Sequence, residues 1–397
     1  MVENPLSEFA RKDIPGLFNE VNVLRQHKTR VEHALNNDTI LPPYEIIIHP
    51  AAGCNLHCDW CIGGRVLEDQ EAKWSDLLPS TLVNPDNMER LITGVVNYRK
   101  EGFRVENISF SGITGEPLVA KQSFVRAVDI LKEEGIRVGL FSNAVLIDEE
   151  IIEALLKIDY INISLDAGTP ETYANLKYGG RPQGKILFER LLGNIDRLVK
   201  ARNESPNSNL QVNSSFVLYP DNYQEIHEAA STLKRLGVGT LRMKQDISGR
   251  KMLSPEQKEE ARQLLERVDG LVDDNFKFVK IHQFGRPADM QRLFHKCVIT
   301  DLMAAIGSDG NVYPCNYNAT LEGAPYGNAI DHSFEEIWEG ETRRQIKNQI
   351  PSICPPYCDP FKTRANNLLQ AVSDSQDKHG VVKTQSYIQE IIDVGER

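Results

Sequence analysis

The sequence lacks long apolar segments and has no excess of basic residues. No apolar run among its 397 residues reaches the roughly 18 residues that a membrane span requires, and the first 41 residues mix acids and bases without the apolar core of a signal peptide. A formal net charge of -11 argues against binding nucleic acid or an anionic membrane, because both attract clustered Lys and Arg. We therefore expect a cytoplasmic protein that has neither nucleic acid nor a membrane as a partner.

The cysteines cannot all pair in disulfides, because the chain has seven of them, an odd number. Three of them lie within eight positions of one another, which suits metal ligation better than a disulfide framework. Apolar residues make up 41% of the chain and charged residues 25%, which is ordinary for a globular protein. The length predicts one large domain with a smaller appendage.

From residue 44 onward, short apolar strands alternate with longer amphipathic helices, a pattern typical of βα units around a parallel sheet. The expected strands are Tyr44 to His49, Val105 to Ser111, Arg137 to Ser142, Tyr160 to Leu165, Gln211 to Leu218 and Thr240 to Lys244. The expected helices between them are Asp86 to Lys100, Lys121 to Glu134, Asp148 to Lys157, Lys185 to Ala201 and Asn222 to Leu236. These six units predict an α/β fold, a partial (β/α)6 barrel of TIM-like type.

We expect four regions along the chain. They are a helical extension over residues 1–43, the partial barrel over 44–250, a small α+β region over 251–362 and a helical tail over 363–397. The extension should contain a helix from Pro15 to Asn37, and the tail a helix from Thr384 to Val394. The third region should open with a helix from Pro255 to Val272, followed by a hairpin at Asp309-Gly310 and a helix from Phe334 to Ile346.

A cluster of three cysteines follows the first expected strand, in the segment Cys54-Asn-Leu-His-Cys58-Asp-Trp-Cys61. The loop at the C-terminal end of a barrel strand lies on the face where such barrels hold their active sites. Three thiolates can hold three irons of a cubane cluster and leave the fourth iron without a protein ligand. The segment therefore predicts an iron-sulfur site with one open iron.

This segment resembles the CxxxCxΦC signature of the radical S-adenosylmethionine (SAM) superfamily, in which Φ is an aromatic residue, here Trp60. The resemblance implies that the three cysteines hold a 4Fe-4S cluster whose open iron binds the amino and carboxylate groups of SAM. One electron from the cluster would cleave SAM to a 5'-deoxyadenosyl radical, which takes a hydrogen atom from the substrate. An external donor such as a flavodoxin or ferredoxin would supply that electron.

Two simpler interpretations of this segment stay open. One is a structural zinc site that borrows a fourth ligand such as His57, although zinc favours paired cysteine spacings and a closed fourth position. The other is that Trp60 serves only in packing, because an indole needs no adenine beside it to be buried.

Polar residues end the next strands, as the resemblance requires. The segment Gly112-Ile-Thr114-Gly115-Glu116-Pro is similar to the family's GGE motif, with Thr114 in place of the first glycine. Gly115 permits close approach of the backbone, and the resemblance implies that Glu116 accepts from the SAM ammonium group.

The ends of the third and fourth strands are similar to the family's T/S-N and S-L-D segments. The residues concerned are Ser142, Asn143, Ser164 and Asp166, and the resemblance implies contacts with the ribose hydroxyls and methionine carboxylate of SAM. Taken singly, each is an ordinary polar residue at a strand end, and the alternative for Ser164 or Asp166 is that it only caps the next helix. Lys244, Gln245 and Asp246, which end the sixth strand, are either substrate contacts or a solvated turn.

Four further cysteines, Cys297, Cys315, Cys354 and Cys358, are separated by 17, 38 and 3 residues. Four thiolates can fully ligate a second cluster, and tetrahedral zinc is the alternative. With four residues between Gly310 and Cys315, the arrangement resembles the twitch subdomain, a shorter relative of the SPASM domain. The resemblance implies one auxiliary 4Fe-4S cluster, whose role is to accept or relay an electron.

Together these features predict a radical SAM oxidoreductase or related radical-modifying enzyme that oxidises its substrate or forms a new bond in it. Within the resemblance, we favour a small molecule such as a sugar or aminocyclitol, because residues 1–43 look too short for a peptide-recognition domain. Modification of a ribosomally made peptide or protein is the alternative. A zinc-stabilised binding protein without enzyme activity is the third hypothesis.

Overall fold

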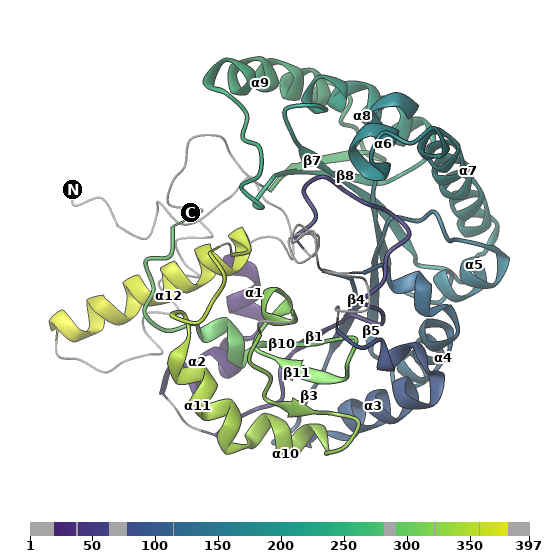
Figure 1. Cartoon of the computed structure of the whole chain (residues 1–397). Helices are drawn as coiled ribbons and strands as arrows, with labels where there is room; N and C mark the ends of the chain where they lie inside the picture. The colour runs from purple at the N-terminus through teal and green to yellow at the C-terminus, as the bar shows by residue number, and fades with distance from the viewer. Residues whose placement is uncertain are drawn as a thin grey trace.

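The computed structural model describes residues 20–36, 39–62, 78–113, 115–281, 291–320, 323–356 and 358–379, with the backbone alone for 372–379. Its main feature is one long curved sheet with helices along its outer side (Figure 1). The order of the strands is β12 (Gly327–Asn328), β11 (Asn311–Tyr313), β10 (Met303–Ile306), β1 (Glu45–Ile48), β4 (Asn107–Phe110), β5 (Arg137–Ser142), β6 (Tyr160–Ser164), β7 (Gln211–Leu218), β8 (Thr240–Gln245) and β9 (Lys277–Lys280). The expected α/β fold is confirmed.

The six expected barrel strands are present as β1, β4, β5, β6, β7 and β8, and each pairs in parallel with the next. The register places the strand ends at one edge, because Ile48 lies opposite Phe110 and Phe110 opposite Leu140. The loops that follow β1, β4, β5 and β6 therefore meet at the same rim of the sheet. A further parallel strand, β9, extends the sheet beyond β8.

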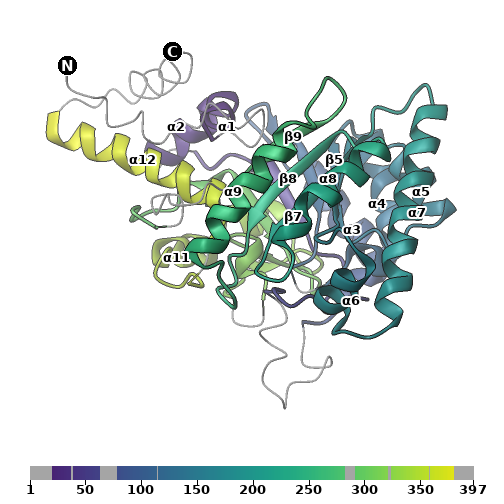
Figure 2. The same ribbon diagram turned by 90° about the horizontal axis from the view of Figure 1, so that it is seen from above.

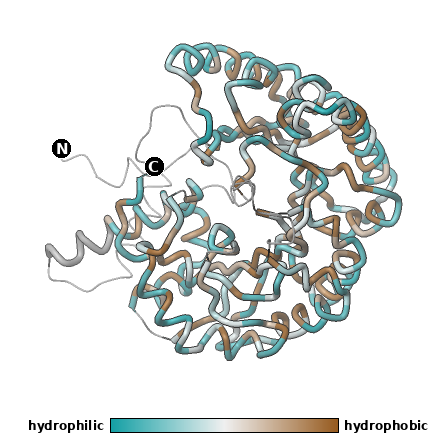
Figure 3. Tube along the Cα trace, viewed as in Figure 1, coloured by the Kyte–Doolittle hydropathy of each residue, from teal (hydrophilic) through white to brown (hydrophobic). Residues whose placement is uncertain are grey.

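Helices cover the outer face of this sheet. They are α3 (Pro85–Asn97), α4 (Lys121–Glu133), α5 (Glu149–Leu155), α6 (Pro170–Tyr178), α7 (Gln183–Glu204), α8 (Ile226–Arg235) and α9 (Pro255–Asp269). Along them, hydrophobic and hydrophilic residues alternate in the way that an amphipathic helix requires (Figure 3). Capping residues fix where several of these helices begin. Asn84, before α3, accepts from the Asp86 N–H, and Thr169, before α6, accepts from the Thr172 N–H. Sequence periodicity did not predict α6, a short helix.

The inner face of the sheet is polar. On β8, Leu241 and Met243 belong to the core between sheet and helices, so Arg242 and Lys244 lie on the opposite, inner face. The same alternation places the Asn162 side chain inside, between the core residues Ile161 and Ile163. The interior of the partial barrel is thus lined with groups that can bind a polar ligand.

The C-terminal region continues the barrel sheet. Strand β10 pairs in parallel with β1 and forms the expected hairpin with β11, in which Gly310 has φ of 84°. The helix expected from Phe334 to Ile346 is two helices, α10 (Phe334–Glu339) and α11 (Glu341–Gln349), because the extended backbone of Gly340 separates them. The boundary near residue 250 between barrel and C-terminal region stays a prediction.

The N-terminal helix was also expected in one piece, and its described part is two helices, α1 (Glu20–Gln26) and α2 (Lys28–Asn36). They pack with the segment 298–303 and with α12 (Pro360–His379) in a second, smaller hydrophobic cluster. Helix α12 lies beside α1 and projects away from the barrel (Figure 2). The helix expected from Thr384 to Val394 lies outside the described residues. Within the described ranges, no helix is long and apolar enough to cross a membrane.

Candidate active site

The loop that carries the first three cysteines is anchored to the C-terminal end of α6. The backbone N–H of His57 donates to the carbonyl of Lys177, and that of Asp59 to the carbonyl of Leu176, both at 2.8 Å. Cys61 N–H donates to the Cys58 carbonyl at 3.0 Å, which closes a turn within the loop. A helix far along the chain therefore fixes the cysteine loop at the rim of the barrel.

The three thiols of this loop, Cys54, Cys58 and Cys61, are half-buried. Cys54 Sγ accepts from the Leu56 N–H at 3.4 Å and lies 3.9 Å from Asn143 Nδ2. Burial raises the pKa of Cys54 to about 12, and the charge of Glu116 adds to the rise. Burial also raises the pKa of Cys58. Because clusters are bound by thiolates, loading such a site displaces protons.

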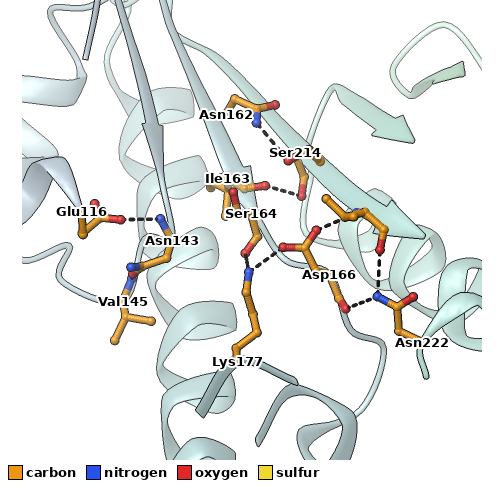
Figure 4. Close-up of polar contacts among 12 residues, drawn as sticks. Glu116, Asn143, Val145, Asn162, Ile163, Ser164, Asp166, Lys177, Ser214 and Asn222 are labelled. Carbon is orange, nitrogen blue, oxygen red and sulfur yellow. Dashed lines mark hydrogen bonds and ion pairs between the residues drawn. The ribbon is translucent and has the colours of Figure 1, made fainter. Parts of the chain in front are cut away.

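Lys177, at the end of α6, is a cation buried beside these thiols. Its side chain is 1% exposed, and Nζ lies 2.6 Å from Asp166 Oδ2 and donates to the Ser164 carbonyl at 2.7 Å (Figure 4). Burial alone would lower the pKa of Lys177, but the charges of Asp166 and Cys58 raise it above its ordinary value. Lys177 therefore stays positive and offsets negative charge on the cysteine loop.

Asp166 itself is held rigidly by protein donors. It has φ of 57°, an uncommon left-handed conformation for a residue other than glycine. Its Oδ1 accepts from the Val217 N–H at 2.7 Å, and its carbonyl accepts from Asn222 Nδ2 at 2.9 Å (Figure 4). With Oδ2 taken by Lys177, the carboxylate joins β6, β7 and α6 at the rim.

Glu116 plays a similar connecting part between the ends of β4 and β5. Glu116 is 3% exposed. Its carboxylate accepts hydrogen bonds from Ser142 Oγ at 2.6 Å, from the Asn143 N–H at 2.9 Å and from the Leu118 N–H at 3.2 Å. Burial raises the pKa of Glu116, and the bonds from Asn143 and Ser142 oppose the rise. Asn143 then reaches the cysteine loop, where Nδ2 donates to Asn55 Oδ1 at 2.8 Å.

The backbone of Gly115 packs closely against the segment that leads into the cysteine loop. A Cβ at this position would lie 2.1 Å from the Ala51 carbonyl oxygen, so only glycine fits. Thr114, the departure from the family's motif, lies outside the described residues. Trp60 is half-buried, with its ring 5.2 Å from that of Tyr219 and 5.9 Å from Lys177 Nζ.

The three candidate substrate contacts at the end of β8 differ in their surroundings. Asp246 accepts from the Ser248 N–H and from Ser248 Oγ, both at 2.7 Å, and so forms a local turn. Lys244 is half-buried, faces the barrel interior, and has no hydrogen bond or ion pair with another described residue. Burial, together with the nearby Arg242 charge, lowers the pKa of Lys244 to about 8. Gln245 is half-buried at the end of the strand.

The four C-terminal cysteines come together from three separate segments. Cys297 precedes a short turn of 3-10 helix before β10, Cys315 follows β11, and Cys354 and Cys358 lie before α12. Burial raises the pKa of Cys297, and the other three thiols add to the rise, so all four lie within electrostatic range of one another. Burial likewise raises the pKa of Cys358 to about 11.

Donors to sulfur surround this set. Asn318 Nδ2 lies 3.3 Å from Cys315 Sγ, and Asn366 Nδ2 lies 3.2 Å from Cys297 Sγ. Among the described residues, no three His, Cys, Asp or Glu side chains converge as closely as a single metal ion would need. Half-buried thiols with N–H donors beside them are the environment that protein-bound iron-sulfur clusters use.

Comparison with known proteins identifies the family. The model of the radical SAM superfamily matches residues 48–233, and that of the SPASM iron-sulfur cluster-binding domain matches residues 297–359. The chain belongs to the radical SAM superfamily. It is therefore an enzyme with iron-sulfur clusters and SAM as its cofactors, as predicted, and the non-enzymatic hypothesis is wrong.

Individual relatives are more distant. The tungsten-containing aldehyde ferredoxin oxidoreductase cofactor-modifying protein of Pyrococcus furiosus is 25% identical over 339 residues, which are 78% of this chain and 85% of that protein. Streptococcus suis SuiB bound to S-adenosylmethionine has a TM-score of 0.57 at 16% identity, covering 86% of this chain and 74% of SuiB. The enzyme anSMEcpe with bound AdoMet has a TM-score of 0.56 at 16% identity, covering 89% of this chain and 99% of that one. At these identities the two structures share the fold.

Sequence reasoning missed three residues of this radical SAM enzyme. Lys177 gave no signal because α6 was not expected. Asn366 lies in a tail for which only helical character was predicted. His49 is 2% exposed at the end of β1, and its Nδ1 accepts from the Ile113 N–H at 2.9 Å. Its place between a strand and a cysteine loop was the only signal in the sequence.

Proposed function

We propose that this radical SAM enzyme oxidises, or forms a new bond in, a peptide or protein substrate. The observation that carries the proposal is the meeting of a three-cysteine loop with Glu116, Asn143 and Asp166 at one rim of the sheet. Held by Cys54, Cys58 and Cys61, the cluster would supply the electron for reductive cleavage of SAM, which is the chemistry that permits hydrogen abstraction from the substrate.

The two cysteine sets have different roles in this proposal. Cys54, Cys58 and Cys61 hold the cluster that binds SAM, and the buried Lys177 offsets its negative charge. Cys297, Cys315, Cys354 and Cys358 hold the auxiliary 4Fe-4S cluster. An external one-electron donor such as a flavodoxin or ferredoxin reduces the enzyme.

The rim residues position SAM and the substrate. Trp60, Gly115, Glu116, Ser142, Asn143, Ser164 and Asp166 surround the cosubstrate. The carboxylates of Glu116 and Asp166 already accept hydrogen bonds from protein donors. Their main role is therefore to hold in place the loops whose other groups contact SAM. Lys244, Gln245 and Asp246 contact the substrate. Of these, Lys244 has no hydrogen bond or ion pair with another described residue and so has its ammonium group available for a ligand.

The fold likeness supports a peptide over the small molecule that the sequence favoured. SuiB bound to the precursor peptide SuiA has a TM-score of 0.55 at 19% identity, covering 86% of this chain. The enzyme anSMEcpe with bound AdoMet and the Kp18Cys peptide has a TM-score of 0.55 and covers 89% of this chain. A short N-terminal region is therefore a weak argument against a peptide substrate.

A small molecule is the second candidate. It is favoured by the Pyrococcus furiosus relative, whose name describes the modification of an enzyme's cofactor. In both candidates the rim and the two cysteine sets do the same chemistry, and only the group that enters the polar barrel interior differs.

Deuterium transfer separates these candidates. The anaerobically reconstituted enzyme is incubated with SAM, dithionite and extract of perdeuterated cells of the source organism, divided into a peptide and protein pool and a small-molecule pool. Hydrogen abstraction from a deuterated substrate places deuterium in 5'-deoxyadenosine, which mass spectrometry detects. We expect the label from the peptide and protein pool.

Each other outcome has a distinct meaning. Label from the small-molecule pool alone favours the second candidate. No 5'-deoxyadenosine from a chain that contains zinc in place of iron overturns the radical function itself.

A further inference from the structure

Helix α12 begins directly after the last cysteine and lies outside the segment that matches the SPASM domain, 297–359. Asp359 starts the helix by accepting from the Phe361 N–H at 2.9 Å and the Lys362 N–H at 3.3 Å. The first two turns are polar yet buried: Lys362, Thr363, Arg364, Asn366 and Asn367 are each at most 6% exposed. A polar stripe of this kind needs a polar surface to face.

Asn366 on this stripe is oriented without ambiguity. Its Oδ1 accepts from the Val298 N–H at 2.8 Å and from the Ile299 N–H at 3.3 Å. Since those two donors require the oxygen, the amide nitrogen must point the other way, where it reaches the Lys362 carbonyl at 2.8 Å and Cys297 Sγ at 3.2 Å. Asn366 therefore donates an N–H to one sulfur of the C-terminal set.

Lys362 brings a positive charge to the same set. Its Nζ donates to Asn316 Oδ1 at 2.5 Å, next to Cys315, and lies 5.9 Å from the Tyr317 ring centroid. Although burial lowers the pKa of Lys362, the charges of Cys315, Asp359, Cys358 and Cys297 raise it above its ordinary value. Asp359 is the opposing charge nearby, and the helix N-terminus holds it.

We propose that Lys362 and Asn366 are positioning residues that raise the reduction potential of the auxiliary cluster. A cluster becomes more negative when it gains an electron, so a nearby cation and an N–H donor to sulfur stabilise its reduced form. The inference rests on the proposed assignment of the auxiliary cluster to Cys297, Cys315, Cys354 and Cys358. Neither residue touches the reacting atoms, and neither is replaceable by a merely apolar packing residue in this role.

The test measures the potential of the auxiliary cluster alone in the full chain. Cys54→Ala, Cys58→Ala and Cys61→Ala are combined so that only the C-terminal set loads on reconstitution with iron and sulfide. The potential is then followed by redox titration with electron paramagnetic resonance detection. No substrate or SAM is needed, so the readout is independent of enzyme activity.

Four substitutions are compared in this background. Lys362→Met removes the charge at similar length. Asn366→Asp keeps the acceptor for Val298 and Ile299, removes the donor to Cys297 and, when ionised, adds a negative charge there, and both changes act to lower the potential. Lys362→Arg keeps the charge. Lys200→Met is the matched control, because Lys200 is an exposed cation on α7 and its loss changes the net charge equally.

We expect Lys362→Met and Asn366→Asp to shift the potential to more negative values, and Lys362→Arg and Lys200→Met to leave it in place. An unchanged potential in iron-loaded Lys362→Met and Asn366→Asp overturns the inference. If Lys362→Met takes up no iron, the smaller change Lys362→Gln takes its place beside Asn366→Asp under the same criterion. If the background chain itself takes up no iron, the auxiliary site of the proposed function fails and this inference falls with it, an outcome that the iron content reveals.

Discussion

The two cysteine sets of this enzyme are built in opposite ways. The first set lies on one short loop after β1, and distant residues anchor that loop through backbone hydrogen bonds to the end of α6. The second set is collected from three segments that are far apart in the chain, and the hairpin β10-β11 and α12 bring them together. Local sequence therefore determines the spacing in the first set, and the fold determines it in the second.

Each set also has its own buried cation. Lys177 beside the first set is paired with Asp166 at 2.6 Å, whereas Lys362 beside the second set is bonded to the neutral Asn316. Lys177 contributes less net charge to its surroundings than Lys362, because a carboxylate is in direct contact with Lys177 whereas the group bonded to Lys362 is neutral. Lys177 therefore acts mainly as an anchor of the first set to the barrel. Lys362 on α12 acts mainly on the electrostatic potential at the second set.

The largest expected difference between the sets is in SAM cleavage. Cys58→Ala removes a ligand of the open-iron site, so we expect it to abolish formation of 5'-deoxyadenosine, whereas Cys315→Ala should spare part of it. The measurement is chromatography of 5'-deoxyadenosine after anaerobic reaction with dithionite, with iron content determined for both chains. Equal loss in the two variants would mean that the second set is needed for folding.

A smaller effect is expected on stability at the anchor of the first set. Lys177→Met leaves the buried Asp166 carboxylate without its partner, which costs about 3–5 kcal/mol in comparable buried pairs. The free energy of unfolding is measured by urea denaturation of the cluster-free chain. The double variant Lys177→Met/Asp166→Asn should recover part of the loss.

A matched control for this change is Lys185→Met. Lys185 and Glu171 form an exposed pair with side chains 50% and 62% exposed, so we expect Lys185→Met to cost far less stability than Lys177→Met. A loss from Lys177→Met no larger than that from Lys185→Met would contradict an anchoring role for Lys177.

The smallest effect is a pH dependence at His49, which is buried at the end of β1. Burial lowers the pKa of His49 to about 4, and the Lys362 charge adds to the decrease. Between pH 6.5 and 4 the unfolded chain therefore binds a proton that the folded chain does not. His49 contributes stability above pH 6.5 that is lost as the pH falls toward 4, by at most roughly 3 kcal/mol.

Urea denaturation at a series of pH values checks this prediction. His49→Gln should flatten the decrease in stability below pH 6.5, whereas His332→Gln, at an exposed position, should not. The same slope in both variants would show that other groups, such as the buried His27, determine the acid side of the stability curve.

Much of the barrel was predictable because its signals are local. The six strands read as apolar runs, and β8 shows the alternation of Leu241 and Met243 with inner-face cations. Helix α6 was missed because it spans only Pro170–Tyr178, too short for a clear periodic pattern. Lys177 was missed for the same reason, because its importance depends entirely on where the end of that helix meets Asp166.

The C-terminal region was less predictable because its hydrogen bonds connect distant segments. One long helix was expected where the extended backbone of Gly340 separates two. Asn366 was missed because the groups that orient it, the N–H donors of Val298 and Ile299, lie far from it in sequence.

The sequence by itself determined the family, the α/β class and the first cysteine set, because thiol spacing on a short loop and the periods of strands and helices are properties of neighbouring residues. Only the tertiary structure decided which buried groups act on those cysteines. Lys177, Lys362 and Asn366 gain their roles from contacts across the fold, and the energy of a buried charge or N–H donor depends on what lies beside it in space.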